Sequence, residues 1–405
     1  MNAAEDQPFT IGIEEEYMLV DAATGALAGD PPPEVIETCR DLIDEDTGNA
    51  VPEFLRAQVE VGTTVCPSIK VARERLGRLR SCVAAAAHKY GLAPIAASTH
   101  PFAEWHGQKH TDAERYNTLA NDMQGVAQRL VISGMHVHVG IADDELRVDL
   151  MNQIPYFLPH LLALSTSSPF WRGHNTGLKC YRLSVFDELP RTGLPEKFDS
   201  FSEYQRHLSI MVRAGLIQDA TKLWWDVRAH ARFPTLEMRI PDICTRMDDG
   251  ITIAALYACI ISMLIRLRRS NQRWRVYSNL LVNENRWMAQ RYGFERGLVD
   301  FGLGRVVPYA DLLEEILELT AEDAERLDCQ MEAEHAREIL ARGTSAHRQI
   351  ATFEAALGAG ASEQEAFKAV VDWLREETLV GVPLEAAPGP DGAAAHITEG
   401  SAAGA

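Results

Sequence analysis

The stretch FTIGIEEEYMLVD, residues 9–21, sets three consecutive acids inside an apolar run that is typical of a β-strand. Side chains at positions i and i+2 of a strand point to the same face. Glu14 and Glu16 therefore share one face of the predicted strand, and Glu15 lies on the other with Tyr17. Carboxylates on a half-buried strand are costly unless they meet a cation, so this stretch needs an explanation.

Two later segments repeat this spacing with other polar residues. GMHVHVGI, residues 134–141, alternates as a strand does and sets His136 and His138 on one face. LEMRIPD sets Glu237 and Arg239 on one face of another predicted strand. Taken alone, each pair is typical of a structural feature such as a solvated face or a cross-strand salt bridge. Their joint occurrence in apolar sequence favours one shared site, because charge in such surroundings is costly unless it is paired or metal-bound.

A fourth acidic segment, EFLRAQVEVGTTV at residues 53–65, is predicted as one strand. It carries Glu53 and Glu60, whose odd separation puts them on opposite faces unless the chain bends between them. If the polar faces of these strands line one cleft, its acids repel one another until a divalent cation binds. Carboxylates with few imidazoles suit Mg²⁺ or Mn²⁺ better than Zn²⁺, and Mg²⁺ sites typically include substrate phosphates. The pattern points to nucleotide chemistry, although the chain has neither GxxxxGK[ST] nor GxGxxG before a helix.

Composition limits the class of protein. The 405 residues are 46% hydrophobic, and 39 Lys and Arg against 58 Asp and Glu give a net charge of −19. Such acidity argues against nucleic acid as a partner. We expect no membrane partner, because the apolar run at residues 251–265 is short for a span and typical of a buried helix. Seven scattered cysteines without a CxxC pair, and a polar N-terminus without a signal peptide, indicate a cytoplasmic protein with reduced thiols.

The order of elements, with strands early and helices late, favours the α+β class with an antiparallel sheet. Strands are predicted at residues 9–20, 53–65, 92–98, 134–141, 223–230 and 235–240. Helices are predicted at residues 34–43, 68–90, 112–130, 145–167, 202–214, 250–269, 272–291, 309–318, 321–341, 345–357 and 362–378. We expect a single catalytic domain over residues 1–385 and a disordered tail at residues 386–405, which are rich in Ala, Gly and Pro.

Seven motifs in this order resemble the carboxylate–amine ligase family that is also described as glutamate–cysteine ligase type 2. They are TIGIEEEYMLVD, QVEVGT, THPF, GMHVHVGI, SPFWRGHNTGLKCYR, LPRTGLP and WWDVRAHARFPTLEMRIPD, and the match covers about residues 9–375. The resemblance implies a fold similar to glutamine synthetase and other glutamate–cysteine ligases. In that fold a curved, largely antiparallel sheet holds ATP, metal ions and an amino acid on its concave face, with helices packed outside.

The resemblance also assigns roles to residues of this sequence. The implied metal ligands are Glu14, Glu16, Glu60, His136 and Glu237. The implied contacts to the nucleotide are His138, Arg228 and Arg232. Arg239 would meet the transferred phosphoryl group, and Glu53 is the candidate that accepts a proton from the amine. The loop that frames the amino-acid substrate would contribute Arg172, Thr176, Lys179 and Arg182.

The activity implied by the resemblance is an ATP-dependent ligase that activates the γ-carboxylate of glutamate as an acyl phosphate and joins it to an amine. The cofactors would be ATP with Mg²⁺ or Mn²⁺, and the chain is expected to form a homo-oligomer of two or more copies. The nominal amine is cysteine, and another amine remains open. Two further alternatives remain open: a Zn²⁺-dependent hydrolase built on His136 and His138, and a non-catalytic sensor of nucleotides or amino acids.

Overall fold

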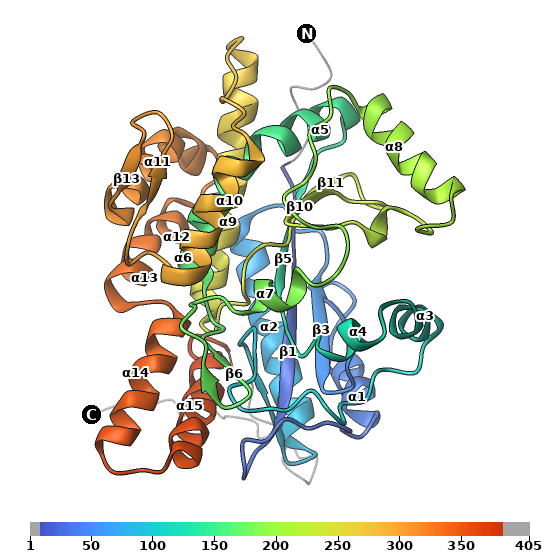
Figure 1. Cartoon of the computed structure of the whole chain (residues 1–405), viewed down its shortest axis with the longest axis vertical. Coiled ribbons are helices and arrows are strands. Elements are labelled where there is room, and N and C mark those ends of the chain that lie inside the picture. The colour runs from blue at the N-terminus through green and yellow to red at the C-terminus, as the bar shows by residue number, and fades with distance from the viewer. Residues whose placement is uncertain (1–8, 384–405) are drawn as a thin grey trace, which may run out of the picture.

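The computed structural model describes residues 9–383, so the predicted tail at residues 386–405 lies outside the described part of the chain. Its centre is an antiparallel sheet of seven strands (Figure 1). The order of strands is β10-β11-β5-β1-β3-β2, and β4 pairs with β1. These strands are β1 (Ile11–Asp21), β2 (Gly48–Pro52), β3 (Gln58–Thr63), β4 (Leu92–Ile95), β5 (Met135–Gly140), β10 (Val227–Ala229) and β11 (Thr235–Met238). The predicted α+β class with a largely antiparallel sheet is confirmed.

Three small two-stranded sheets and the helices complete the described fold. The small sheets are β6 (Phe170–Trp171) with β7 (His174–Asn175), β8 (Thr192–Gly193) with β9 (Trp224–Trp225), and β12 (Leu298–Asp300) with β13 (Arg305–Val307). The helices before residue 250 are α1 (Glu34–Leu42), α2 (Ile69–His88), α3 (Glu114–Met123), α4 (Gly125–Gln128), α5 (Asp144–Gln153), η1 (Ile154–Tyr156), α6 (Leu158–Ser165), α7 (Arg182–Phe186), α8 (Phe201–Arg213) and η2 (Ala220–Lys222). The later helices are α9 (Met247–Arg269), α10 (Asn279–Tyr292), α11 (Tyr309–Arg326), α12 (Gln330–Glu334), α13 (Ala336–Arg342), α14 (Ser345–Gly358) and α15 (Glu363–Thr378).

Helices α2 and α9 pack against the sheet and against each other. Helix α2 contacts β1, β3 and β4, and α9 contacts β5. Within the described residues, α9 is the one helix long and apolar enough to cross a membrane, and most of its apolar stretch is buried in the fold. That burial is expected of a core helix, as the sequence pattern predicted. Helices α10 to α15 lie on the left of the view in Figure 1, and α3, α4 and α8 on the right.

The face of β1 that packs on the helices carries Glu15, as the alternation predicts. Its carboxylate is fully buried and forms an ion pair with Arg80 of α2, with N–O distances of 2.7 and 2.9 Å. The Tyr17 hydroxyl donates a hydrogen bond to the same carboxylate. A buried charge is tolerated when it is both paired and hydrogen-bonded, so Glu15 stabilises the back of the strand whose front carries Glu14 and Glu16.

The prediction of one strand over residues 53–65 is wrong. The chain forms two strands, β2 and β3, joined by a turn at residues 53–57, and the pair is antiparallel with Val51 opposite Glu60. The turn is held by tertiary contacts, because Leu55 forms an isolated bridge with His110 in the segment before α3. A local sequence pattern cannot predict such tertiary contacts.

Several helix boundaries also differ from the prediction. The helix predicted over residues 145–167 is divided by η1, whose Pro155 lacks the N–H that an uninterrupted helix requires. The helix predicted over 112–130 breaks at Gln124, which has a positive φ of 47°. Two other helices also differ. Helix α10 begins at residue 279 instead of 272, and α11 runs unbroken over residues 309–326, where two helices were predicted. Residues 168–195, for which no strand or helix was predicted, contain β6, β7, β8 and α7.

Candidate active site

Strand register brings the polar residues of the front face into neighbouring rows. The antiparallel pairs are Glu14 with His136, Glu16 with Glu60, His138 with Glu237, and Glu237 with Arg228. Apart from Arg228, which only the family resemblance selected, each residue in these pairs comes from a segment that the sequence marked by its i, i+2 spacing or its acids. The sheet thus assembles in space what the sequence distributes over more than two hundred residues.

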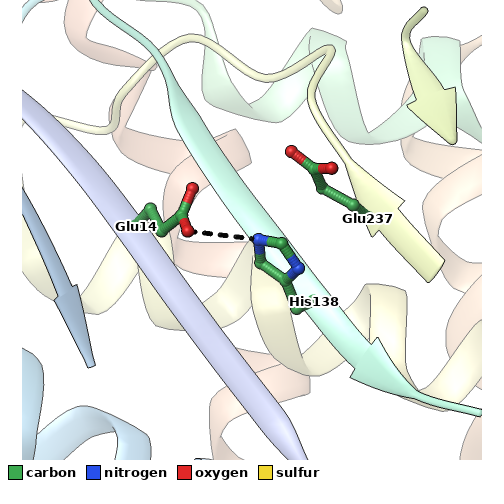
Figure 2. Close-up of side chains that lie close together, drawn as sticks. All are labelled: Glu14, His138 and Glu237. Carbon is green, nitrogen blue, oxygen red and sulfur yellow. Dashed lines mark ion pairs between the residues drawn. The ribbon is translucent and has the colours of Figure 1, made fainter. Parts of the chain in front are cut away.

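A first possible cation site contains Glu14, His138 and Glu237, which come from β1, β5 and β11 (Figure 2). One ligand atom of each residue lies within 4.8 Å of the other two. His138 Nε2 is 3.5 Å from Glu14 Oε1 and makes no hydrogen bond within the described residues. Its other ring nitrogen, Nδ1, is 3.1 Å from the Thr235 hydroxyl. A buried nitrogen without a hydrogen bond is costly, and a bound cation would satisfy it.

A second possible cation site contains Glu16, Glu53 and Glu60, again with ligand atoms within 4.8 Å of one another. The turn between β2 and β3 brings Glu53 to the same side as Glu60, which the sequence allowed only if the chain bends. The Tyr116 hydroxyl of α3 donates hydrogen bonds of 3.0 Å to the Glu53 carboxylate and to the carbonyl of Pro52. Tyr116 therefore holds this turn against the sheet.

Burial and neighbouring acids raise the pKa values of two acids of the second site, Glu16 and Glu60. Burial raises the pKa of Glu16 to about 7, and the charge of Glu53 contributes in the same direction. Burial and the charges of Glu53, Glu14 and Glu16 raise the pKa of Glu60 well above its ordinary value. Burial also favours the neutral form of Glu14, but the hydrogen bonds and charges of His136 and His138 together outweigh burial and lower the pKa of Glu14. A divalent cation would relieve the repulsion within the second site.

Glu237 lies between Arg228 and Arg239, whose guanidinium groups differ in how many N–H donors are left for a ligand. Arg228 Nε is 2.6 Å and Arg239 Nη1 is 2.5 Å from its carboxylate. Burial would raise the pKa of Glu237, but the charges of Arg239 and Arg228 hold it well below its ordinary value. Arg228 also donates to the carbonyls of Thr221 and Leu223.

The Arg239 guanidinium keeps donor capacity for a ligand. Its buried Nε makes no hydrogen bond within residues 9–383, whereas Nη1 is used by Glu237 and lies 3.4 Å from His136 Nδ1. Of the two arginines on Glu237, Arg239 is therefore the better placed to meet an anionic group.

His136 lies between the two acidic groups and is a member of neither. Its Nδ1 is 3.0 Å from Glu14, and its Nε2 is 3.9 Å from Glu16. Burial and then the charge of Arg239 lower the pKa of His136 to about 4, so the imidazole is neutral near pH 7. The resemblance implied a metal ligand at His136 and a nucleotide contact at His138. In the structure, His138 is the histidine with a ring nitrogen in the first possible cation site.

The residues expected around the amino acid are separated in the structure. Arg182 lies beside the site, where it lines a cavity with Glu16 and Arg239 and donates to three backbone carbonyls of residues 239–241. Its guanidinium packs against Gly134, where a β-carbon would collide with it. The other three have partners elsewhere: Arg172 with Glu104, Thr176 with the Pro169 carbonyl, and Lys179 with Glu295. Arg232, a predicted nucleotide contact, is exposed in the loop between β10 and β11.

Two residues of the site were missed at the sequence level. Thr235, the partner of His138 Nδ1, lies two positions before Glu237, so the i, i+2 rule that selected Glu237 could also have selected it. Tyr116, the partner of Glu53, lies on a helix far along the chain. No local pattern links it to the acids.

The donor set fits Mg²⁺ or Mn²⁺, because five carboxylates and one imidazole form the two sites, and both cations favour oxygen ligands. Two carboxylate-rich sites beside a buried arginine suit phosphoryl transfer from a nucleotide. The fold and the site together define an ATP-dependent carboxylate–amine ligase, an enzyme that forms C–N bonds.

The model of one protein family, "Glutamate-cysteine ligase family 2(GCS2)", matches residues 10–372, and the chain belongs to that family. A protein of Rhodospirillum rubrum named "Putative glutamate--cysteine ligase 2" is 60% identical over 94% of this chain and 99% of its own length. A protein of Jannaschia sp. with the same name is 53% identical over 92% of this chain and 97% of its own length. Neither the hydrolase nor the sensor alternative is favoured by this membership.

Solved structures with low sequence identity share the fold. A glutamate–cysteine ligase from Francisella tularensis in complex with AMP is 14% identical, with a TM-score of 0.64, over 92% of this chain and 89% of its own. A bifunctional glutathione synthetase from Pasteurella multocida is 16% identical, with a TM-score of 0.65, over 91% of this chain. This chain spans 52% of that longer protein. The predicted similarity to the fold of other glutamate–cysteine ligases is thus confirmed.

Proposed function

We propose that this ligase activates the γ-carboxylate of glutamate with ATP and joins it to an amine, with cysteine as the nominal acceptor. The observation that supports this most directly is the position of Arg239. Its Nη1 pairs with Glu237 of the first acidic group, and its buried Nε makes no hydrogen bond within residues 9–383. Its side chain also shares a cavity wall with Glu16 of the second group. A phosphate group bound at both acidic groups would contact this guanidinium.

The roles of the acidic residues follow from the two sites. Glu14, His138 and Glu237 would hold one Mg²⁺ or Mn²⁺, and Glu16 and Glu60 would hold another. Bound cations would neutralise the phosphate oxygens of ATP and orient them for transfer. His136, neutral and adjacent to Glu14, keeps that carboxylate in place by a hydrogen bond.

The roles of the arginines differ. Arg239 stabilises the charge on the transferred phosphoryl group. Arg228 keeps Glu237 oriented, because four of its hydrogen bonds go to Glu237 and to backbone carbonyls. Arg182 is the candidate that binds the α-carboxylate of glutamate, because it lines the same cavity as Arg239.

The reaction proceeds in two balanced steps. A γ-carboxylate oxygen attacks the terminal phosphorus of ATP, the bond to the bridging oxygen breaks, and ADP leaves. The amine nitrogen then attacks the acyl carbon, a C–N bond forms, and the bond from carbon to the phosphate oxygen breaks. The ammonium form of the amine loses one proton before the attack, and Glu53 on the cavity wall is the candidate acceptor of that proton. The amine nitrogen loses a second proton as the amide forms, and this proton leaves with the phosphate.

Family membership supports small-molecule substrates, and the remaining properties are part of the proposal. The free cysteines, six of them buried, are those of a protein kept in a reducing compartment, and we place it in the cytoplasm. We also expect a homo-oligomer without nucleic acid or membrane as partners. The size of the assembly would be measured by light scattering.

The test measures ADP and phosphate release by purified protein with ATP, Mg²⁺, glutamate and a panel of amines that includes cysteine. We expect release that needs both glutamate and an amine. Glu14→Gln and Arg239→Lys should lower it by at least about a hundredfold. Glu314→Gln is the matched control, because Glu314 is an exposed acid paired with Arg337 on the surface. Release that persists without glutamate, or that survives both substitutions, would refute the proposal.

A further inference from the structure

Three basic side chains gather near the second acidic group, and the reaction described above does not use them. Lys222 ends η2, Arg191 lies between α7 and β8, and Arg115 lies on α3. Burial and then the charges of Arg115 and Arg191 lower the pKa of Lys222, so the three cations are close enough to repel one another. Arg191 also belongs to LPRTGLP, one of the motifs of the sequence that the site has left without a role.

The backbone fixes Arg191 and Lys222 as neighbours. Strands β8 and β9 pair in parallel, and the N–H of Trp224 donates a hydrogen bond to the carbonyl of Arg191. Arg191 Nε in turn donates a hydrogen bond of 3.0 Å to the carbonyl of Lys222. The φ of Arg191 is 63°, in the left-handed region that is costly for a residue with a side chain. The fold therefore holds this arginine beside Lys222 although another residue, glycine, suits the backbone better.

The two neighbouring cations keep donors for a ligand. Within residues 9–383, neither Lys222 nor Arg191 forms an ion pair with a carboxylate. Asp219 and Asp122 act on Lys222 only through their charge. The Asp219 carboxylate instead accepts hydrogen bonds from the N–H and the hydroxyl of Thr221. An anionic group of a ligand would therefore find both cations without a direct partner.

These basic side chains lie next to the wall of the cavity that holds the candidate base. Trp224 and Glu53 both line this cavity. The Arg191 guanidinium lies over the Trp224 ring, 5.4 Å from the ring centroid. Arg115 Nη2 lies 3.8 Å from Glu53 Oε2. An amine that gives its proton to Glu53 therefore has cationic groups close by.

We propose that Lys222 and Arg191 bind the α-carboxylate of an amino acid that serves as the amine acceptor. The proposal rests on the ligase function proposed above, and cysteine satisfies it. In an α-amino acid the amine and the carboxylate share one carbon atom, so the base for the amine and the cations for the carboxylate must lie close together. Arg115 connects the two, because it contacts Glu53 and its charge acts on Lys222. Lysine and arginine donate charge-assisted hydrogen bonds to carboxylates.

The anionic groups of the other two reactants have other partners in the proposed reaction. The phosphates of ATP meet the cations bound at the two acidic groups, and the transferred phosphoryl group meets Arg239. The α-carboxylate of glutamate is assigned to Arg182, which lines the cavity with Arg239. The acceptor is the reactant whose carboxylate has no partner yet. Separate KM values for ATP, glutamate and the acceptor distinguish these three sources of a negative charge.

The test compares cysteine with cysteamine, which has the same amine and thiol but no carboxylate. ADP release by the intact protein is measured with ATP, Mg²⁺ and glutamate over a range of acceptor concentrations, and the γ-glutamyl product is identified by mass. The wild-type kcat/KM should be at least about tenfold higher for cysteine, because cysteamine forms no charge-assisted hydrogen bond at the basic side chains. Alanine and ethylamine repeat the comparison without a thiol.

Variants locate the preference in the basic side chains. Lys222→Met and Arg191→Met each remove one charge, and each should raise the KM for cysteine by about tenfold or more. The KM values for cysteamine, glutamate and ATP should stay unchanged, and turnover of cysteamine shows that each variant is folded. Lys222→Arg keeps the charge and should keep the preference for cysteine. Lys89→Met is the matched control, because Lys89 is exposed at the end of α2.

The outcomes separate this proposal from the function on which it rests. A preference for cysteine over cysteamine that Lys222→Met removes supports both. Equal kcat/KM for the two acceptors in wild type, or an equal loss with both in Lys222→Met, keeps the ligase function and overturns the carboxylate site. A rise in the KM of glutamate or ATP in place of cysteine also overturns it, because the cations would then bind another reactant. Absence of release with every amine refutes the ligase function itself.

Discussion

Replacement of Arg80 by Met should destabilise the fold more than almost any other single substitution of a charged residue. Arg80 is fully buried on α2 and donates five hydrogen bonds. Two go to the Glu15 carboxylate, and three go to backbone carbonyls of Cys244, Thr245 and Thr378. Arg80 thus joins β1 to the segment before α9 and to the end of α15.

The size of the effect follows from what Arg80→Met leaves behind. Removal of one partner of a buried ion pair costs about 3–5 kcal/mol, because the other charge stays buried without compensation. The lost bonds to three carbonyls act in the same direction, so we expect a loss of at least about 4 kcal/mol. Proteins are stable by about 5–15 kcal/mol, so this variant should unfold at much lower urea concentration.

The assay is urea unfolding followed by the fluorescence of the seven tryptophans. Glu15→Met, Arg80→Met and the double variant complete a cycle with wild type. Because the double variant leaves neither charge buried, its loss should be smaller than the sum of the single losses by about 2 kcal/mol or more. A loss below about 1 kcal/mol for Arg80→Met, or additive losses in the cycle, would refute this account of the buried pair.

Three further predictions follow from other parts of the fold. Glu14→Gln should weaken Mn²⁺ binding at least about a hundredfold in calorimetric titration, while the exposed Glu314→Gln should bind as wild type does; equal affinity in both would contradict the first cation site. Burial lowers the pKa of His100 and of His160 to about 4 from an ordinary value of 6.5, so the unfolded chain takes up these protons first as the pH falls. The free energy of unfolding should therefore decrease from pH 6.5 to pH 4 by about 3 kcal/mol for each histidine, and His100→Gln should flatten the profile measured by denaturation. Gly134→Ala should cost about 1–3 kcal/mol in the same denaturation assay, because its β-carbon would collide with a buried guanidinium; wild-type stability would show that the glycine is not needed.

The faces of the strands could be predicted from the sequence because strand alternation is a local property. The i, i+2 rule places Glu14 and Glu16 together and Glu15 opposite, and the register confirms this arrangement. The same rule selected the polar pairs of β5 and β11. Neighbouring strands then needed only antiparallel pairing to bring these pairs onto one face.

The rest of the site depends on contacts between distant segments, which a local pattern does not contain. Glu53 meets Glu60 because the chain turns between β2 and β3, and Tyr116 holds that turn from another helix. The different donor capacity of Arg228 and Arg239 depends on which backbone carbonyls the fold places beside each guanidinium. A sequence motif can select both arginines, but it cannot tell which one is already occupied.

Strand β1 explains why three acids can follow one another in an apolar run. The middle acid, Glu15, is balanced within the protein by Arg80, so the back of the strand is stable without a ligand. Its neighbour Glu16 faces Glu53 and Glu60, and these acids repel one another. A cation bound there would relieve that repulsion. It would also stabilise the fold, since it binds the folded chain and not the unfolded one. The strand therefore separates a charge that stabilises the fold from charges that are available for chemistry, and a single residue step along the chain is enough to do so.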